Sequence, residues 1–298
     1  MVHNYSIFLS QSYLDTVDDY DRSLYSPNYP HWDYIVLTAS NKLQAEIFNK
    51  QISERKQSHM LPQKTKFVVV HDRDGKRVGS GGATLSVLRE IFNREHGFSD
   101  FKILVIHSGG DSKRVPQYSA IGKLFSPVPK KLPNGRLSTL FDEFLISMSS
   151  MAGRIHDGML LLSGDVLLLF NPLQVDYSGK GAACISFKED VNTGKNHGVY
   201  LNGEDGYVRQ CLQKQSVEKL REVGAVDERN MVDIDTGAVI FSSEMLEDLY
   251  SLVDTDEKVK GCDSKKSFGA IERKKKNIDD SLTDEISEAW AKRYGGAK

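Results

Sequence analysis

Short apolar runs alternate along the chain with stretches in which apolar residues recur at helical spacing. The longest runs predict strands at YIVLTA (34–39), KFVVVHD (66–72), FKILVIH (101–107) and MLLLSGDVLLLF (159–170), the last broken at its Ser-Gly-Asp and then resumed. Shorter strands are predicted at 182–187, 197–202, 207–214 and 237–241. The periodicity predicts helices over 42–55 (Leu43, Ile47 and Ile52 near one face), from about Thr84 onward, and over 138–151.

Strands rich in valine, isoleucine and leucine, with helices between them, predict an α/β fold. Its sheet is expected to be mostly parallel and covered on both faces. Such sheets bind ligands at the carboxyl ends of their strands. Segments 79–84, 108–114 and 163–165 each follow a predicted strand end, so the three together predict one site at this edge. From residue 258 to 298 the chain turns polar, which predicts a loosely ordered tail.

Composition and charge exclude several classes of function. The 298 residues have a formal net charge of −2, so no overall positive field attracts nucleic acid or a membrane surface. No apolar run approaches the roughly 20 residues that span a membrane. Cys184, Cys211 and Cys262 are scattered, and the N-terminus lacks a secretory pattern, so a cytoplasmic location is expected. Nothing in these patterns indicates an oligomeric state.

The segment GSGGAT (79–84) has the composition of a phosphate-binding turn. Glycine lets a backbone approach an anion closely, and the helix that follows adds partial positive charge. The spacing matches neither the dinucleotide fingerprint nor the P-loop. A tight strand-to-helix turn capped by Thr84 is therefore the alternative. The candidate nucleotide contacts are Gly79, Ser80, Gly81, Gly82 and Thr84.

The second segment, HSGGDSKRVPQYSAIGKLF (107–125), combines backbone donors with cations. A phosphoryl group under attack needs both to stabilise its developing charge. The alternative is that these cations are solvated surface side chains. The candidate donors are Ser108, Gly109 and Gly110, and the candidate catalytic cations are Lys113, Arg114 and Lys123.

The third segment places Asp165 at the end of a strand predicted to be buried. A buried carboxylate is costly unless it is paired or binds a cation. Mg²⁺ prefers one or two carboxylates together with phosphate oxygens. Asp165 is therefore a candidate Mg²⁺ ligand, and an aspartate-stabilised turn is the alternative.

These motifs resemble those of sugar nucleotidyltransferases, whose signature is Gly-Gly-x-Gly-Thr-Arg-Leu followed by Pro-Lys. The segment GGDSKRV matches it at Gly109, Gly110 and Arg114. It departs from it at Ser112, Lys113 and Gly122, where the signature has glycine, threonine and proline. The combination of GSGGATL, HSGGDSKRVPQYSAIGKLF and LLLSGD is similar to the narrower L-fucokinase/fucose-1-phosphate guanylyltransferase family, from the N-terminus to about residue 257.

The resemblance implies a Rossmann-like sheet of the nucleotide-diphospho-sugar transferase (GT-A-like) type over residues 1–257, with 258–298 as an atypical tail. It implies GTP and L-fucose 1-phosphate as substrates, GDP-L-fucose and pyrophosphate as products, and Mg²⁺ on Asp165. It also implies that Lys214 contacts the sugar phosphate and that Asp235, with Asp233 as an alternative, contacts sugar hydroxyls or a second metal. His197, at the start of a predicted strand, is a further candidate for the sugar-phosphate site. A surface lysine and a turn aspartate are the alternatives for these positions.

Other functional classes remain as alternatives. The sequence has no sugar-kinase segment, so kinase activity is not expected. A truncated or non-catalytic nucleotide-sugar-binding protein is the main alternative. A Rossmann-type oxidoreductase is disfavoured, because neither glycine-rich segment has the dinucleotide fingerprint.

Overall fold

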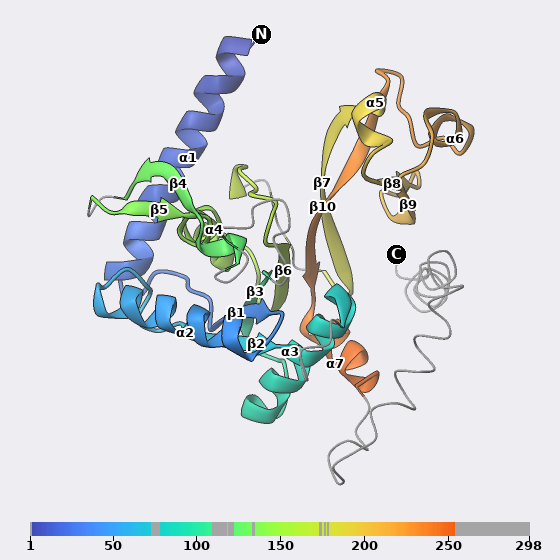
Figure 1. Cartoon of the computed structure of the whole chain (residues 1–298). Helices are drawn as coiled ribbons and strands as arrows, with labels where there is room; N and C mark the ends of the chain where they lie inside the picture. Colours follow the sequence, from blue (N-terminus) through green and yellow to red (C-terminus); the bar gives the residue numbers. More distant parts are fainter. Residues whose placement is uncertain are drawn as a thin grey trace. The chain divides into compact units, whose positions relative to one another are not determined.

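The computed structural model describes residues 2–72, 78–108, 118, 122–132, 135–172, 175, 177 and 179–253 (Figure 1). By its internal contacts the chain divides into a larger unit, Met1–Ala183 with Gly237–Val253, and a smaller unit that contains Cys184–Thr236. The predicted domain boundary at residue 257 and the tail at 258–298 lie outside the described residues.

The larger unit contains the parallel part of the sheet. The strands β1 (Tyr34–Ala39), β2 (Lys66–His71), β3 (Lys102–His107) and β6 (Gly158–Ser163) lie in the order β2-β1-β3-β6 and run parallel. The end of β10 (Met231–Phe241) pairs antiparallel with β6. Every residue of β1 is buried, which explains its continuous apolar run. The predicted α/β fold with a mostly parallel sheet is confirmed.

Besides the N-terminal helix, the larger unit contains the helices α2 (Lys42–Gln57), α3 (Gly79–Glu95), α4 (Leu140–Met148) and α7 (Ser243–Ser251), with short 3-10 turns at η3 (Lys123–Phe125) and η4 (Ser150–Gly153). Side chains cap the starts of α2, α4 and α7. Asn41 caps α2, and Thr139 forms a capping box with Asp142 at α4. The prediction that Leu43 lies on the apolar face of α2 is wrong. Leu43 is exposed, because the buried face contains Gln44, Ala45, Phe48, Ile52 and Arg55.

The N-terminal helix α1 (Val2–Tyr25) was not predicted from the hydrophobic pattern. Over residues 7–25, where burial in α1 is described, the buried residues follow a four-residue spacing: Ser12, Thr16 and Tyr20, of which the first two are small and polar. Apolar Ile7 and Leu14 are exposed, so polarity and burial disagree along this helix. α1 packs against α4, next to the antiparallel pair β4 (Pro127–Lys131) and β5 (Leu137–Thr139) (Figure 1).

Two details predicted at the edge of the sheet are wrong. The helix α3 begins at Gly79, not near Thr84, so GSGGAT belongs to a helix although glycine disfavours helices. Residues 166–170 form no strand. The N–H of Val166 donates to the carbonyl oxygen of Ser163 at 3.3 Å, which closes a turn and takes the apolar segment out of the sheet.

The smaller unit is an antiparallel sheet with short helices. It contains the first half of β10, with β8 (Gly198–Asn202) and β9 (Val208–Gln213), in the order β10-β8-β9, while β7 (Ala182–Asp190) pairs with β10. The helices are α5 (Val191–Gly194) and α6 (Val217–Glu222). Its core contains Val191, Val199, Leu220, Val232 and Ile234. The shorter strands predicted at 182–187, 197–202 and 207–214 are confirmed.

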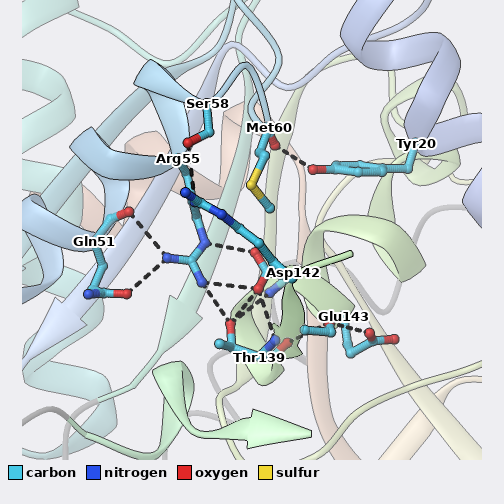
Figure 2. A network of polar contacts seen from close by, with 10 residues as sticks. Tyr20, Gln51, Arg55, Ser58, Met60, Thr139, Asp142 and Glu143 are labelled. Atoms are coloured by element: carbon cyan, nitrogen blue, oxygen red, sulfur yellow. Dashed lines mark hydrogen bonds and ion pairs between the residues drawn. The ribbon is translucent and has the colours of Figure 1, made fainter. Parts of the chain in front are cut away.

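A buried ion pair joins α2 to α4 in the larger unit (Figure 2). Arg55 donates to both carboxylate oxygens of Asp142, at 2.7 and 3.0 Å, and to the Thr139 hydroxyl at 3.1 Å. The Arg55 guanidinium also lies 5.1 Å from the centroid of the Phe125 ring. We call Arg55, Asp142, Thr139 and Phe125 the buried network. It fixes η3, because Phe125 is the last residue of that turn.

Candidate active site

A pocket of about 330 Å³ opens at the carboxyl ends of the parallel strands. Its volume is within the usual range of small-molecule sites. The strand ends contribute Thr38, Ala39, Ser40, Asp72, His107, Ser108, Ser163, Gly164 and Asp165. The remaining lining residues are Gly79, Ser80 and Ala83 of α3 and Lys123 of η3. We call this hollow the strand-end pocket, and all of these residues belong to the larger unit.

The pocket brings together residues from the three segments that the sequence predicted to meet. Gly79, Ser80, Ser108, Lys123 and Asp165 line it. Three further candidates, Gly81, Gly82 and Thr84, belong to the first turns of α3 but are not among its lining residues. Gly109, Gly110, Lys113 and Arg114 lie outside the described residues.

The N-terminus of α3 lines this pocket through Gly79, Ser80 and Ala83. Gly79 has φ +74°, a conformation that favours glycine, and open space surrounds the position of a Cβ there and at Gly81. No side chain in the described part of the chain caps the helix, whose N-cap residue is Val78. The first N–H groups of a helix lack partners within the helix and carry partial positive charge. This end of α3 can therefore bind an anionic group.

Thr84 does not cap the helix, which excludes one alternative from the sequence. It lies in the second turn of α3, and its hydroxyl donates to the carbonyl oxygen of Ser80 at 3.0 Å. The same hydroxyl oxygen lies 3.0 Å from Nε2 of His107. Thr84 thus connects the first turn of α3 to the end of β3.

Lys123 and Asp165 form an open ion pair in the pocket. Nζ of Lys123 lies 3.7 Å from Oδ2 of Asp165, and the two side chains are 33% and 54% exposed. Ser163 donates to the other carboxylate oxygen at 2.7 Å. The expectation that Asp165 is buried is wrong, because the chain turns away from the sheet directly after Ser163. Exposed pairs stabilise a fold little, so both groups can exchange partners with a ligand at small cost.

Two glycines permit the backbone conformations on which the Lys123–Asp165 pair depends. Gly122 precedes Lys123 with φ +73°, which proline, the residue of the general signature at this place, cannot adopt. The N–H of Gly164 donates to the carbonyl oxygen of His107 at 2.9 Å. A Cβ on Gly164 would lie 2.5 Å from that oxygen. Only glycine lets the turn before Asp165 approach β3 this closely.

The carboxylates of the pocket fit a Mg²⁺ ion that arrives with phosphate. Asp72 and Asp165 both line the pocket. Within the described ranges, no group of three or more His, Cys, Asp or Glu residues could hold a metal by itself. Mg²⁺ is commonly held by one or two carboxylates together with substrate phosphates and water. This donor set therefore suits a nucleotide-bound Mg²⁺ better than a resident ion.

His107 is a pocket residue that the sequence analysis did not select. Its Nδ1 lies 3.2 Å from the Thr38 hydroxyl oxygen, opposite the Nε2 contact with Thr84. Burial lowers the pKa of His107 from 6.5 to about 4, so the ring is neutral at pH 7. The available signal was a titratable residue that ends an apolar strand, one residue before the pair Gly109 and Gly110.

The predicted sugar-phosphate residues belong to the smaller unit. The N–H of Lys214 donates to the carbonyl oxygen of His197 at 3.0 Å, and both side chains are exposed. Asp235 accepts a hydrogen bond from the Tyr200 hydroxyl at 2.6 Å. Its alternative, Asp233, forms an ion pair with Lys188 at 3.1 Å. His197 and Lys214 are thus neighbours at the paired ends of β8 and β9.

The described chain contains no helix that is both long and apolar enough to cross a membrane.

The fucose pyrophosphorylase domain matches residues 95–287. The chain is 29% identical to the bifunctional fucokinase/GDP-fucose pyrophosphorylase of Arabidopsis thaliana, over 88% of this chain and 27% of that protein. It is 29% identical to the fucose-1-phosphate guanylyltransferase of Homo sapiens, over 65% of this chain and 34% of that protein. The L-fucokinase/L-fucose-1-P guanylyltransferase of Bacteroides fragilis is 27% identical, over 78% and 26% of the respective chains.

The chain therefore aligns with only about a quarter to a third of the length of each of these relatives. The family match begins at the last residue of α3 and includes β3, η3 and β6, which contribute His107, Lys123 and Ser163 to the lining of the strand-end pocket. It covers more than half of the sequence. The chain belongs to the fucose pyrophosphorylase domain family.

Proposed function

We propose that this chain transfers the GMP group of GTP to L-fucose 1-phosphate, with GDP-L-fucose and pyrophosphate as products. The family match over residues 95–287 carries this proposal. The names of the human and bacterial relatives contain the same guanylyltransferase activity. A cytoplasmic location, expected from the scattered cysteines, accompanies the proposal.

The reaction needs no covalent intermediate on the protein. A phosphate oxygen of L-fucose 1-phosphate attacks the α-phosphorus of GTP. The bond between that phosphorus and the bridging oxygen breaks, and pyrophosphate leaves with the electron pair. The protein then contributes by aligning the two anionic substrates and by neutralising the charge that develops on phosphate oxygens.

Each part of the strand-end pocket has a proposed role in this alignment. The N–H groups at the start of α3, including those of Gly79 and Ser80, would bind the nucleotide. Lys123 would exchange Asp165 for a phosphate oxygen of the triphosphate. Arg114, which matches the signature, would hold the triphosphate with it, helped by Lys113. The open geometry of the Lys123–Asp165 pair supports this exchange.

Asp165 would hold Mg²⁺ together with phosphate oxygens of GTP. The ion would supply positive charge and fix the orientation of the phosphates. Lys214, His197 and Asp235 remain the proposed contacts for the sugar phosphate. The backbone hydrogen bond between Lys214 and His197 supports their acting together.

The test is pyrophosphate release by the purified chain, with sugar 1-phosphates screened against the four common nucleoside triphosphates. We expect the highest kcat/KM for the pair of GTP and L-fucose 1-phosphate. Arg114→Ala and Asp165→Ala should each abolish most turnover without unfolding the protein. Lys131→Ala is the control, because Lys131 lies on β4 and does not line the pocket.

Three results would contradict the proposal. They are preference for another substrate pair, near-normal release by either variant, and binding of GTP without release of pyrophosphate. The last result would favour a nucleotide-sugar-binding protein.

A further inference from the structure

We propose that His107 is a positioning residue that fixes the first turn of α3 against the sheet through a directed chain of hydrogen bonds. The ligand that this turn would receive, a nucleoside triphosphate, rests on the proposed function. The positioning itself rests on four contacts in the larger unit.

The contacts determine which atom donates and which accepts in each hydrogen bond of this series. The Thr84 hydroxyl donates to the carbonyl oxygen of Ser80, so its oxygen is left to accept from Nε2–H of His107. Nδ1 then carries no proton and accepts from the Thr38 hydroxyl. The oxygen of that hydroxyl accepts the N–H of Ser108 at 3.3 Å. Each donor and acceptor in the series is thereby used once, and the assignment requires the neutral Nε2–H tautomer.

The two ends of this series of hydrogen bonds lie in different secondary-structure elements. Thr38 and Ser108 lie at the ends of β1 and β3, where the Ser108 hydroxyl also donates to the Thr38 carbonyl oxygen at 2.6 Å. Ser80 and Thr84 lie in α3, whose start has no cap from a described side chain. His107 therefore couples a rigid sheet edge to the helix end that presents the N–H donors. Burial keeps the pKa of His107 near 4, which preserves the neutral ring that the series of hydrogen bonds requires.

Helix α3 contains a matched control for this arrangement. The Ser86 hydroxyl donates to the carbonyl oxygen of Gly82 at 3.0 Å, four residues back, as Thr84 does to Ser80. His107 contacts Thr84 and not Ser86. A variant of Ser86 therefore removes a hydroxyl-to-carbonyl hydrogen bond of the same kind within α3, and it leaves the hydrogen bonds of His107 intact.

The experiment compares Thr84→Val, Thr84→Ser and Ser86→Ala by hydrogen exchange of residues 79–84 and by calorimetric titration with GTP and Mg²⁺. Thr84→Val keeps the shape and removes the hydroxyl. We expect it to speed exchange in the first turn and to weaken GTP binding about tenfold, as the loss of these two part-buried hydrogen bonds would. Thr84→Ser should restore most of both properties, and Ser86→Ala should change neither.

A long-range ¹H–¹⁵N correlation spectrum of the histidine side chains reports the tautomer independently. The inference is overturned if His107 carries its proton on Nδ1 at pH 7. It is also overturned if Thr84→Val and Ser86→Ala have equal exchange in residues 79–84. Wild-type protein that binds no GTP would refute the proposed function instead, and the exchange rates would still decide whether His107 positions α3.

Discussion

The larger unit contains two charged clusters of opposite character, the buried network and the Lys123–Asp165 pair of the strand-end pocket. Arg55 and Asp142 are 9% and 2% exposed, and two hydrogen bonds join them at 2.7 and 3.0 Å (Figure 2). Lys123 and Asp165 are 33% and 54% exposed, and their charged atoms lie 3.7 Å apart. A buried charge must keep its partner, whereas an open pair can exchange it. The first cluster therefore serves stability and the second can serve ligand binding.

The two clusters are also connected, through η3. Arg55 contacts the ring of Phe125, the last residue of this turn, and Lys123 is its first residue. The ring of Phe125 also lies 5.2 Å from that of Phe48 in α2, centroid to centroid. The buried network thus holds η3 in place, and η3 positions Lys123 in the strand-end pocket.

The largest effect on stability should follow from breaking the buried network. Asp142→Ala leaves the Arg55 guanidinium buried without its carboxylate and removes the capping box of α4. We expect the free energy of unfolding to fall by about 3–5 kcal/mol, measured by urea denaturation. Glu46→Ala, at an exposed site in α2, is the comparison. Similar losses in the two variants would show that the buried pair has no special weight.

The opposite result is expected for the open pair. Lys123→Ala should leave the free energy of unfolding within about 1 kcal/mol of the wild type, because exposed pairs contribute little. It should lower kcat/KM for pyrophosphate release about a hundredfold, the usual effect of removing one group that stabilises developing charge. A variant that unfolds as easily as Asp142→Ala, with unchanged activity once folded, would reverse the comparison between the clusters.

In the described part of the chain, His107 is a pocket residue without a charged partner, and its mostly buried ring should make stability depend on pH. The pKa of His107 is about 4 in the folded protein and near 6.5 when unfolded. Between these values the unfolded chain binds a proton that the folded chain does not. Stability should therefore be greatest above pH 6.5 and fall as the pH drops from 6.5 to 4. Allowing for the part of the residue that is not buried, the loss is about 2 kcal/mol.

His107→Gln tests this assignment by denaturation at pH 4 and pH 7. The variant has no group to titrate at this position, so the difference in stability between the two pH values should be smaller than in the wild type. An equal difference in both proteins would assign the pH dependence to other groups.

Periodicity predicted the parallel strands well, because buried strands consist of consecutive apolar residues, as in β1 and β3. It missed α1, whose buried Ser12 and Thr16 are polar, and it extended β6 into Val166 and Leu167, which are apolar but exposed. In each case hydrophobicity and burial disagree. Hydrophobicity is the only sign of burial in a single sequence, so a single sequence could not predict the burial of these residues.

The location of the candidate site was predicted more accurately than the exposure and contacts of its residues. Three segments did meet at the strand ends, because parallel strands bring their carboxyl ends to one edge. The exposure of Asp165 and the role of Thr84 could not be predicted, since both depend on where a turn and a helix begin. His107 was overlooked because its partners, Thr38 and Thr84, are distant in sequence and chemically ordinary.

The smallest effects separate backbone conformation from ligand contact at the start of α3. Gly81 has open space around a Cβ and no positive φ, so Gly81→Ala should stabilise the protein by about 0.5–1 kcal/mol through helix propensity. Gly79 has φ +74°, so Gly79→Ala should destabilise it by about 1 kcal/mol. If this turn binds the nucleotide, Gly81→Ala should weaken GTP binding despite its higher stability, because a methyl group then stands where phosphate must approach the backbone. Stabilisation with unchanged GTP affinity, measured by thermal denaturation and calorimetry on the same samples, would remove Gly81 from the binding surface and leave Gly79 and Ser80 as the contacts.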